Sequence, residues 1–168
     1  MRVLIAWLVA GALLAIVASG QVARADEEKI PLDKVPKAVL DAVKARFAGA
    51  QLTGAEKEVE NGKTLYEIAL KYNDHKIEAA FTPDGKLVEI EKQVPASDIP
   101  AAVRQALEIK YPNATFKMVE EVTKVTNGQE TLEYYEVLLE TAQNKKFEVC
   151  VTAEGKITKE EDKSKGKG

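Results

Sequence analysis

The side chains of this sequence whose type and spacing could support a function are glutamates that recur in corresponding places. Glu67 and Glu136 each follow a tyrosine in two similar segments. Glu78 and Glu148 occupy corresponding places in the next apolar segments. Carboxylates gathered on one surface can receive a basic partner or a divalent cation, and their field speeds the encounter with cations. The alternative interpretation is that these glutamates only solvate the wet face of a sheet.

Catalytic groups are scarce by comparison. The sequence has one histidine, His75, in a turn-like segment, and one cysteine, Cys150. A nucleophile and base would have to lie within hydrogen-bond distance and be oriented by a third group. Only a pocket joining Cys150 to His75 would supply such a pair. We therefore predict that the protein is not an enzyme and has no catalytic residues, cofactor or dedicated metal motif.

Cys150 has two further interpretations. In the alternation of its strand it shares the side of Glu148, away from the apolar side chains. A lone thiol there could pair with another chain or sense oxidation. The favoured prediction is a small side chain buried where two parts of the protein meet, because free cysteine is among the most buried residue types.

Composition narrows the function classes. The 168 residues are 45% hydrophobic and 30% charged, with a net charge of −3, which is ordinary for a globular protein. An acidic chain without a basic stripe argues against a nucleic-acid partner. A single cysteine rules out an internal disulfide framework.

Residues 1–25 have the order of a secretory signal peptide: a short positive start, an apolar run and a final Ala23-Arg24-Ala25. The run is shorter than the roughly 20 apolar residues of a typical membrane-spanning helix. We expect cleavage after Ala25, no stable membrane insertion afterwards, and a periplasmic or secreted location. A retained anchor is the alternative.

The rest of the sequence contains an internal duplication. Val35–Val39 resembles Ile99–Val103 at an offset of 64 residues, and Phe81–Lys86 resembles Val151–Lys156 at an offset of 70. The growth in offset falls around Asn127-Gly128, where a hairpin loop tolerates insertion. We therefore predict two tandem repeats, covering residues 33–94 and 97–162, and a disordered tail over 163–168.

Each copy opens with apolar residues four apart, which predicts one face of a helix. Four segments of alternating polarity follow, separated by turns such as Asn73-Asp74 and Asn127-Gly128. The predicted fold class is α+β, with each repeat a helix packed on a four-stranded antiparallel β-meander. The linker of residues 93–98 is short, so the units should touch, and one continuous sheet is an open alternative.

The helix should cover one face of the meander and leave the other free. Alternation places the predicted binding residues on this helix-free face, together with neighbouring glutamates. The binding residues are Glu67, Glu78, Glu136, Glu148 and Tyr134, and the neighbours are Glu58, Glu60, Glu89 and Glu91.

The helix opening Val-Pro-x-Ala-Val, the Phe-Ala-Gly-Ala helix end, the Tyr-Glu-Ile strand and the Asp-Gly-Lys turn together resemble the PepSY-like, β-lactamase-inhibitor-like repeat of exported bacterial proteins. The resemblance covers residues 33 to 162. It implies a helix on an antiparallel sheet, an extracytoplasmic setting, and binding or inhibition instead of catalysis. The chain departs from the β-lactamase inhibitor because Cys150 cannot form the disulfides within each repeat seen there.

We therefore predict an exported, monomeric or weakly dimeric protein that binds an envelope or extracellular protein or peptide, with peptidase inhibition as one form of that role. The alternative is a small-ligand or divalent-cation binder that uses the same acidic face.

Overall fold

The computed structural model describes residues 26–60 and 62–164. The predicted signal peptide and residues 165–168 of the predicted tail lie outside these ranges. Within them the chain forms two α-helices and nine strands, with a short 3-10 turn before each helix. In chain order the elements are β1 (Asp26–Lys29), η1 (Leu32–Lys34), α1 (Lys37–Arg46), β2 (Gln51–Glu60), β3 (Lys63–Tyr72), β4 (His75–Phe81), β5 (Leu87–Gln93), η2 (Ala96–Asp98), α2 (Ala101–Lys110), β6 (Thr115–Thr126), β7 (Gln129–Glu140), β8 (Lys146–Val151) and β9 (Ile157–Asp162).

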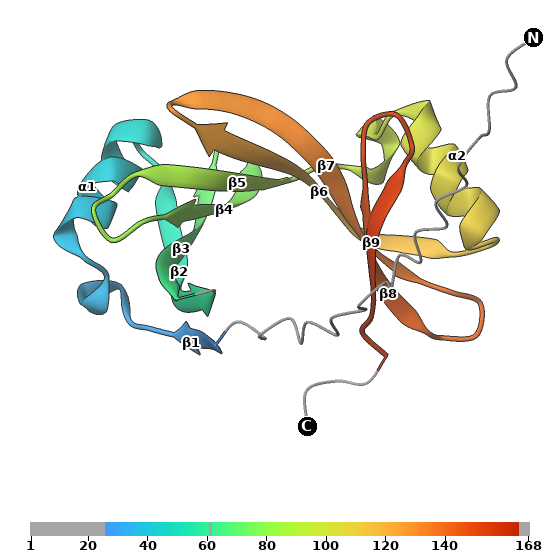
Figure 1. Ribbon diagram of the computed structural model, residues 1–168, viewed down its shortest axis with the longest axis horizontal. Helices are drawn as coiled ribbons and strands as arrows, with labels where there is room; N and C mark the ends of the chain where they lie inside the picture. The colour runs from blue at the N-terminus through green and yellow to red at the C-terminus, as the bar shows by residue number, and fades with distance from the viewer. Residues whose placement is uncertain (1–25, 61, 165–168) are drawn as a thin grey trace, which may run out of the picture.

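The nine strands form one antiparallel sheet in sequence order, β1 to β9 (Figure 1). The predicted fold class, two repeats of one helix on a four-stranded meander, is therefore wrong, although the α+β class fits. The units are not separate because β5 pairs with β6, from Glu89 opposite Lys124 to Gln93 opposite Glu120. This pairing satisfies backbone groups that two separate meanders would leave exposed at their edges. The four-residue strand β1, which the sequence did not predict, extends the sheet beyond β2.

Both helices follow from the apolar spacing seen in the sequence. Val39 and Val43 of α1 are fully buried, as are Val103 and Leu107 of α2. A spacing of four residues keeps each pair on one side of its helix, against the sheet. The predicted helical stripes are thus confirmed.

Each helix closes its own apolar core. The first core joins α1 to strands β2–β5 around Ile68, Leu70 and Phe81. The second joins α2 to strands β6–β9 around Leu139 and Val149. The strand register places the inward residues of both cores on the same side of the sheet, so both helices cover one face.

Close contact between helix and sheet requires glycine at Gly85, in the loop between β4 and β5. Its φ is +83°, and a Cβ atom there would lie 2.5 Å from the Ala38 carbonyl oxygen. Gly155 stands in the same relation to Ala102, at 2.6 Å. The loops after β4 and β8 can therefore lie against the starts of α1 and α2.

Tight turns and bulges shape the sheet. Asn73 and Asp74 both have positive φ between β3 and β4, as do Asn127 and Gly128 between β6 and β7, which confirms the predicted hairpins. The β6–β7 pairing contains two register shifts, one of them at Val122/Thr123. Bulges bend a strand and increase its twist, and this long hairpin is visibly arched in Figure 1.

Candidate functional site

The helix-free face of the sheet is lined by glutamates, and we call it the acidic face. Cross-strand pairing and alternation place these side chains on one side of β2 to β8. Its members are Glu56, Glu58, Glu67, Glu78, Glu89, Glu91, Glu120, Glu136 and Glu148. The four predicted binding glutamates all belong to it. The side chain of Glu60, also expected there, lies outside the described part of the chain.

Glu67 and Glu78 meet on β3 and β4. Burial raises the pKa of Glu67 to about 8, and the charge of Glu78 adds to the shift. The protonated carboxyl of Glu67 donates a hydrogen bond to Glu78, which favours the neutral form further. The pKa of Glu67 is therefore raised mainly by burial, and the neighbouring Glu78 carboxyl adds to the shift.

Glu91, Glu120 and Glu136 form a second group, on β5, β6 and β7. One carboxylate oxygen of each lies within 4.8 Å of the other two. Burial raises the pKa of Glu91 to about 9 and that of Glu120 to about 7, with further contributions from neighbouring carboxylates. The pKa of Glu136 is also raised, mainly by burial and next by the charge of Glu148.

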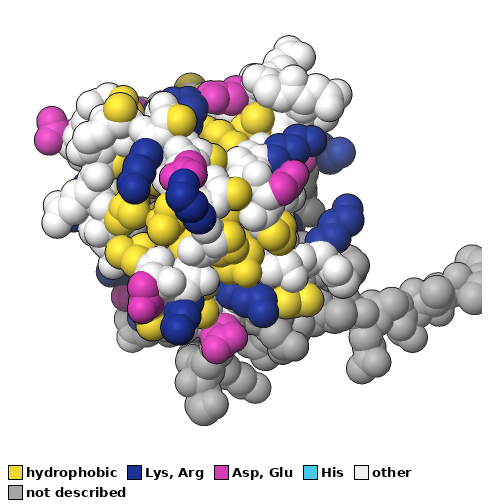
Figure 2. All heavy atoms as spheres, turned by 90° about the vertical axis from the view of Figure 1, so that its left-hand side faces the viewer, with side chains coloured by type: hydrophobic (Ala, Val, Ile, Leu, Met, Phe, Trp, Pro, Cys, Tyr) yellow, Lys and Arg dark blue, Asp and Glu magenta, His cyan; other side chains and the backbone are white. Residues whose placement is uncertain are grey.

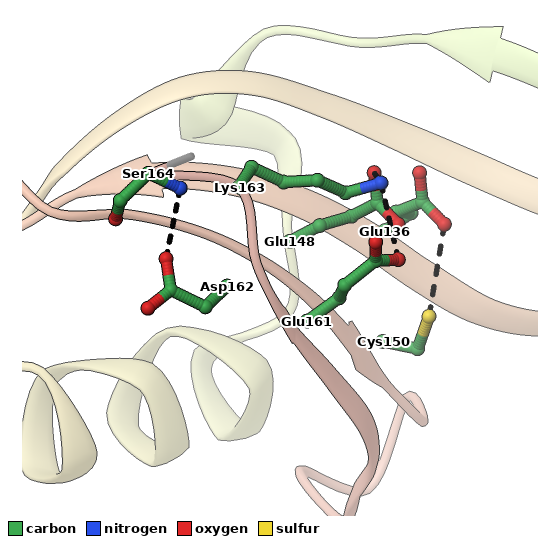
Figure 3. A network of polar contacts seen from close by, with 7 residues as sticks. All are labelled: Glu136, Glu148, Cys150, Glu161, Asp162, Lys163 and Ser164. Atoms are coloured by element: carbon green, nitrogen blue, oxygen red, sulfur yellow. Dashed lines mark hydrogen bonds and ion pairs between the residues drawn. The ribbon is translucent and has the colours of Figure 1, made fainter. Parts of the chain in front are cut away.

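Glu148 lies at the end of the acidic face and is neutralised there. Lys163 Nζ is 3.0 Å from a carboxylate oxygen of Glu148 and 3.1 Å from one of Glu161. Figure 3 shows the lysine side chain reaching over both carboxylates, with Glu136 close by. Glu148 therefore differs from the glutamates at the middle of the face, because it forms an ion pair with Lys163.

Cys150 is buried beside Glu136, and its thiol donates to a Glu136 carboxylate oxygen at 3.7 Å (Figure 3). Burial and the charge of Glu136 raise the pKa of Cys150 to about 12. A thiol this weakly acidic is a poor nucleophile at neutral pH. The predicted burial is confirmed, but the residue lies between β7 and β9, away from the junction of β5 with β6.

Tyr134 lies on the acidic face opposite Val122. Burial, followed by the charge of Glu89, raises the pKa of the phenol above its ordinary value. Val122 is fully buried although its side chain points away from both helices. Of these two residues only Tyr134, which is half-buried, presents surface next to the carboxylates.

His75 has no part in this face. Its Nδ1 lies 3.3 Å from the Gln93 carbonyl oxygen. Cys150 is hydrogen-bonded to Glu136 instead of to His75. His75 and Lys92 line a cleft of about 290 Å³ beside the ion pair between Arg46 and Glu130. Figure 2 views the α1 end of the molecule, where hydrophobic, basic and acidic side chains are interspersed.

Sequence reasoning missed Glu120. The alternation of Met118, Glu120 and Val122 could have placed it on one side of a strand. Its position opposite Glu136 could not be found that way. Pairing counted back from the Asn127-Gly128 turn puts Glu120 opposite Tyr135, and the register shift at Val122/Thr123 moves it by one residue.

Comparison with protein families matches residues 21–87 and 65–159 to the family described as "Putative beta-lactamase-inhibitor-like, PepSY-like". Comparison with curated proteins finds no match.

Three solved structures have the same fold. A DUF2874 family protein from Bacteroides uniformis is 18% identical, with a TM-score of 0.63, over 79% of this chain and 92% of that one. A BLIP-like protein from Bacteroides fragilis is 19% identical, with a TM-score of 0.57, over 82% and 91%. A protein from Bacteroides eggerthii is 18% identical, with a TM-score of 0.61, over 77% and 90%.

The protein from B. eggerthii is described as a "putative periplasmic" protein, and the predicted periplasmic or secreted location agrees with that description. In the described ranges no helix has the length and apolar character needed to cross a membrane.

Proposed function

The chain belongs to the PepSY-like family, and from this premise we propose that it is an exported, non-catalytic binding module. Its acidic face holds a basic segment of a partner protein or peptide. The family's description names an inhibitor-like group, and the B. fragilis neighbour is called BLIP-like. Inhibitors act by binding, so both descriptions support a binding role over a catalytic one.

One observation carries the choice of partner chemistry: within the described residues, the central carboxylates of the acidic face form no ion pair with a lysine or arginine. Glu89 is paired with Lys124 and Glu148 with Lys163. In the described part of the chain no ion pair is found for the five central carboxylates, Glu67, Glu78, Glu91, Glu120 and Glu136. The face is therefore neutralised at its margins and not at its centre.

Such a centre favours a cationic partner. Carboxyl groups whose pKa values are raised by burial and by one another hold protons near neutral pH. A lysine or arginine side chain in their place would restore the carboxylate charges and form charge-assisted hydrogen bonds with them. Tyr134, which is half-buried, offers adjoining apolar contact for the stem of such a side chain.

The test uses a fluorescent lysine-rich peptide and measures its anisotropy at low salt. The double variant Glu67→Gln/Glu136→Gln should bind the peptide at least about tenfold more weakly, a loss of about 1.4 kcal/mol. The control, Glu108→Gln/Asp33→Asn, removes two exposed acids elsewhere and should bind within about twofold of the wild type. Equal binding by all three proteins, or equal loss in both variants, would reject the acidic face as the site.

Peptidase inhibition is the narrower form of this proposal. It requires a basic segment at or near the active site of a peptidase. Inhibition assays with envelope peptidases should show slower cleavage with the wild type than with Glu67→Gln/Glu136→Gln. If the protein binds a partner but does not slow cleavage, the binding role stands and the inhibitory role is rejected.

A further inference from the structure

We infer that Glu91, Glu120 and Glu136 form a binding site for Ca²⁺ on the acidic face. This inference goes beyond the proposed function, because it concerns an inorganic ion bound directly by the chain, with or without a partner.

The spacing of the three carboxylates suits calcium. One oxygen from each lies within 4.8 Å of the other two. Ca²⁺ binds oxygen at 2.3–2.6 Å, so two ligands on opposite sides of the ion lie up to about 5 Å apart. Separations up to this limit allow the three oxygens to contact one ion after small rotations of the side chains, while the strands keep their positions. Mg²⁺ holds its ligands at 2.0–2.1 Å, which limits the separation to about 4.2 Å, and Zn²⁺ prefers nitrogen and sulfur ligands.

Glu120 supplies an independent indication of a missing ligand. Its side chain is 9% exposed, and among the described residues it is the one charged residue that is buried. Across residues 26–60 and 62–164 its carboxylate has neither a hydrogen-bond donor nor an ion-pair partner. Burying a carboxylate without a partner is costly. Its oxygen points instead toward those of Glu91 and Glu136, which are also acids.

A cation has both a path to this place and further ligands. Glu120 borders a cleft of about 450 Å³, which is also lined by Glu78, Gln93 and two lysines, Lys71 and Lys76. Gln93 stands opposite Glu120 in the sheet, so its amide oxygen lies on the same face. Ca²⁺ takes six to eight oxygens, and three carboxylates, an amide and water from the cleft can provide them.

The experiment titrates the purified protein, without any partner, with CaCl₂ by calorimetry, and measures the melting temperature in parallel. The expected dissociation constant is about 0.1–1 mM, the range of extracellular calcium modules. Glu120→Gln should weaken binding by tenfold or more. Glu108→Gln removes an exposed acid of α2, away from the acidic face, so it should bind Ca²⁺ within about twofold of the wild type.

Two further measurements keep the test decisive. Circular dichroism in EDTA shows whether Glu120→Gln is folded; if it is not, Glu91→Gln replaces it. Terbium luminescence excited through tyrosine reports binding near Tyr134, and Glu120→Gln should abolish it. Absence of heat and of any melting shift at 10 mM Ca²⁺ would overturn the inference. So would equal losses in Glu120→Gln and Glu108→Gln, or binding of Mg²⁺ or Zn²⁺ in preference to Ca²⁺.

The peptide assay of the proposed function is run in EDTA, so the two ideas fail separately. Peptide binding without calcium binding would reject only the ion site. Calcium binding without peptide binding would reject only the basic partner.

Discussion

Glu120 on β6 and Glu136 on β7 lie directly opposite each other, with both carboxyl groups on the helix-free face. Like charges in this relation destabilise a sheet, and burial strengthens the repulsion. The raised pKa values of both carboxyl groups favour their neutral forms, and a protonated carboxyl carries no charge to repel its neighbour. The same logic applies along the centre of the acidic face and leads to the first prediction.

Stability should fall as the pH rises, in part through Glu67. The pKa of this carboxyl is raised to about 8 in the folded protein by burial and by Glu78. The folded state therefore holds a proton that the unfolded state has lost. The stabilising contribution is complete below pH 4.5 and disappears as the pH passes 8. Glu67→Gln should reduce the loss between pH 5 and pH 8.5 by up to about 4 kcal/mol in urea titrations, since one pKa unit corresponds to about 1.4 kcal/mol. Glu108→Gln, on the exposed side of α2, serves as the control and should leave the slope unchanged.

Gly85 and Gly128 separate the cost of a close contact from the cost of a positive φ. Both have positive φ, but only at Gly85 would a Cβ meet another atom, the Ala38 carbonyl oxygen. Gly128→Ala should lose about 1 kcal/mol from the left-handed conformation alone. Gly85→Ala should lose a further 1–3 kcal/mol, roughly, from overpacking. Chemical denaturation measures both, and equal losses would show that the loop after β4 can move away from α1.

Cys150 should resist alkylation in the folded protein. Its side chain is 1% exposed, and burial raises its pKa to about 12. Iodoacetamide at pH 8 should react at least about 100-fold more slowly with the native protein than with protein in 8 M urea, because both thiolate fraction and access are reduced. Mass spectrometry follows the reaction. Native labelling at the urea rate would contradict the burial and restore the sensor interpretation.

Arg46 and Glu130 join α1 to the tip of the β6–β7 hairpin at 3.0 Å, across 84 residues of sequence. Both side chains are 44% exposed, so the pair should contribute only about 0.2–1 kcal/mol. A double-mutant cycle with Arg46→Ala and Glu130→Ala measures this coupling. The coupling should shrink in 1 M salt, where screening is complete within a few ångströms. A coupling above 2 kcal/mol, unaffected by salt, would show that the hairpin tip is held in a less polar setting than the structure gives it.

The sequence by itself determined the local elements and the side each residue faces. Val39 and Val43 lie four apart and are buried, because a helix of 3.6 residues per turn places them on one face. Asn73-Asp74 and Asn127-Gly128 form turns, because asparagine, aspartate and glycine tolerate positive φ. Alternation along each strand correctly placed Glu67, Glu78, Glu136 and Glu148 away from the helices.

Only the tertiary structure decided which strands pair and in what register. The backbone groups of β5 and β6 pair without regard to side-chain type. The residue pattern therefore did not predict that the two meanders join in one sheet. A single bulge at Val122/Thr123 then moves Glu120 from Tyr135 to Glu136 and creates the buried carboxylate group. Periodicity is a property of neighbouring residues along the chain. Register depends on the packing and backbone hydrogen bonds of strands far apart in sequence, and that dependence becomes visible only when the sheet is assembled.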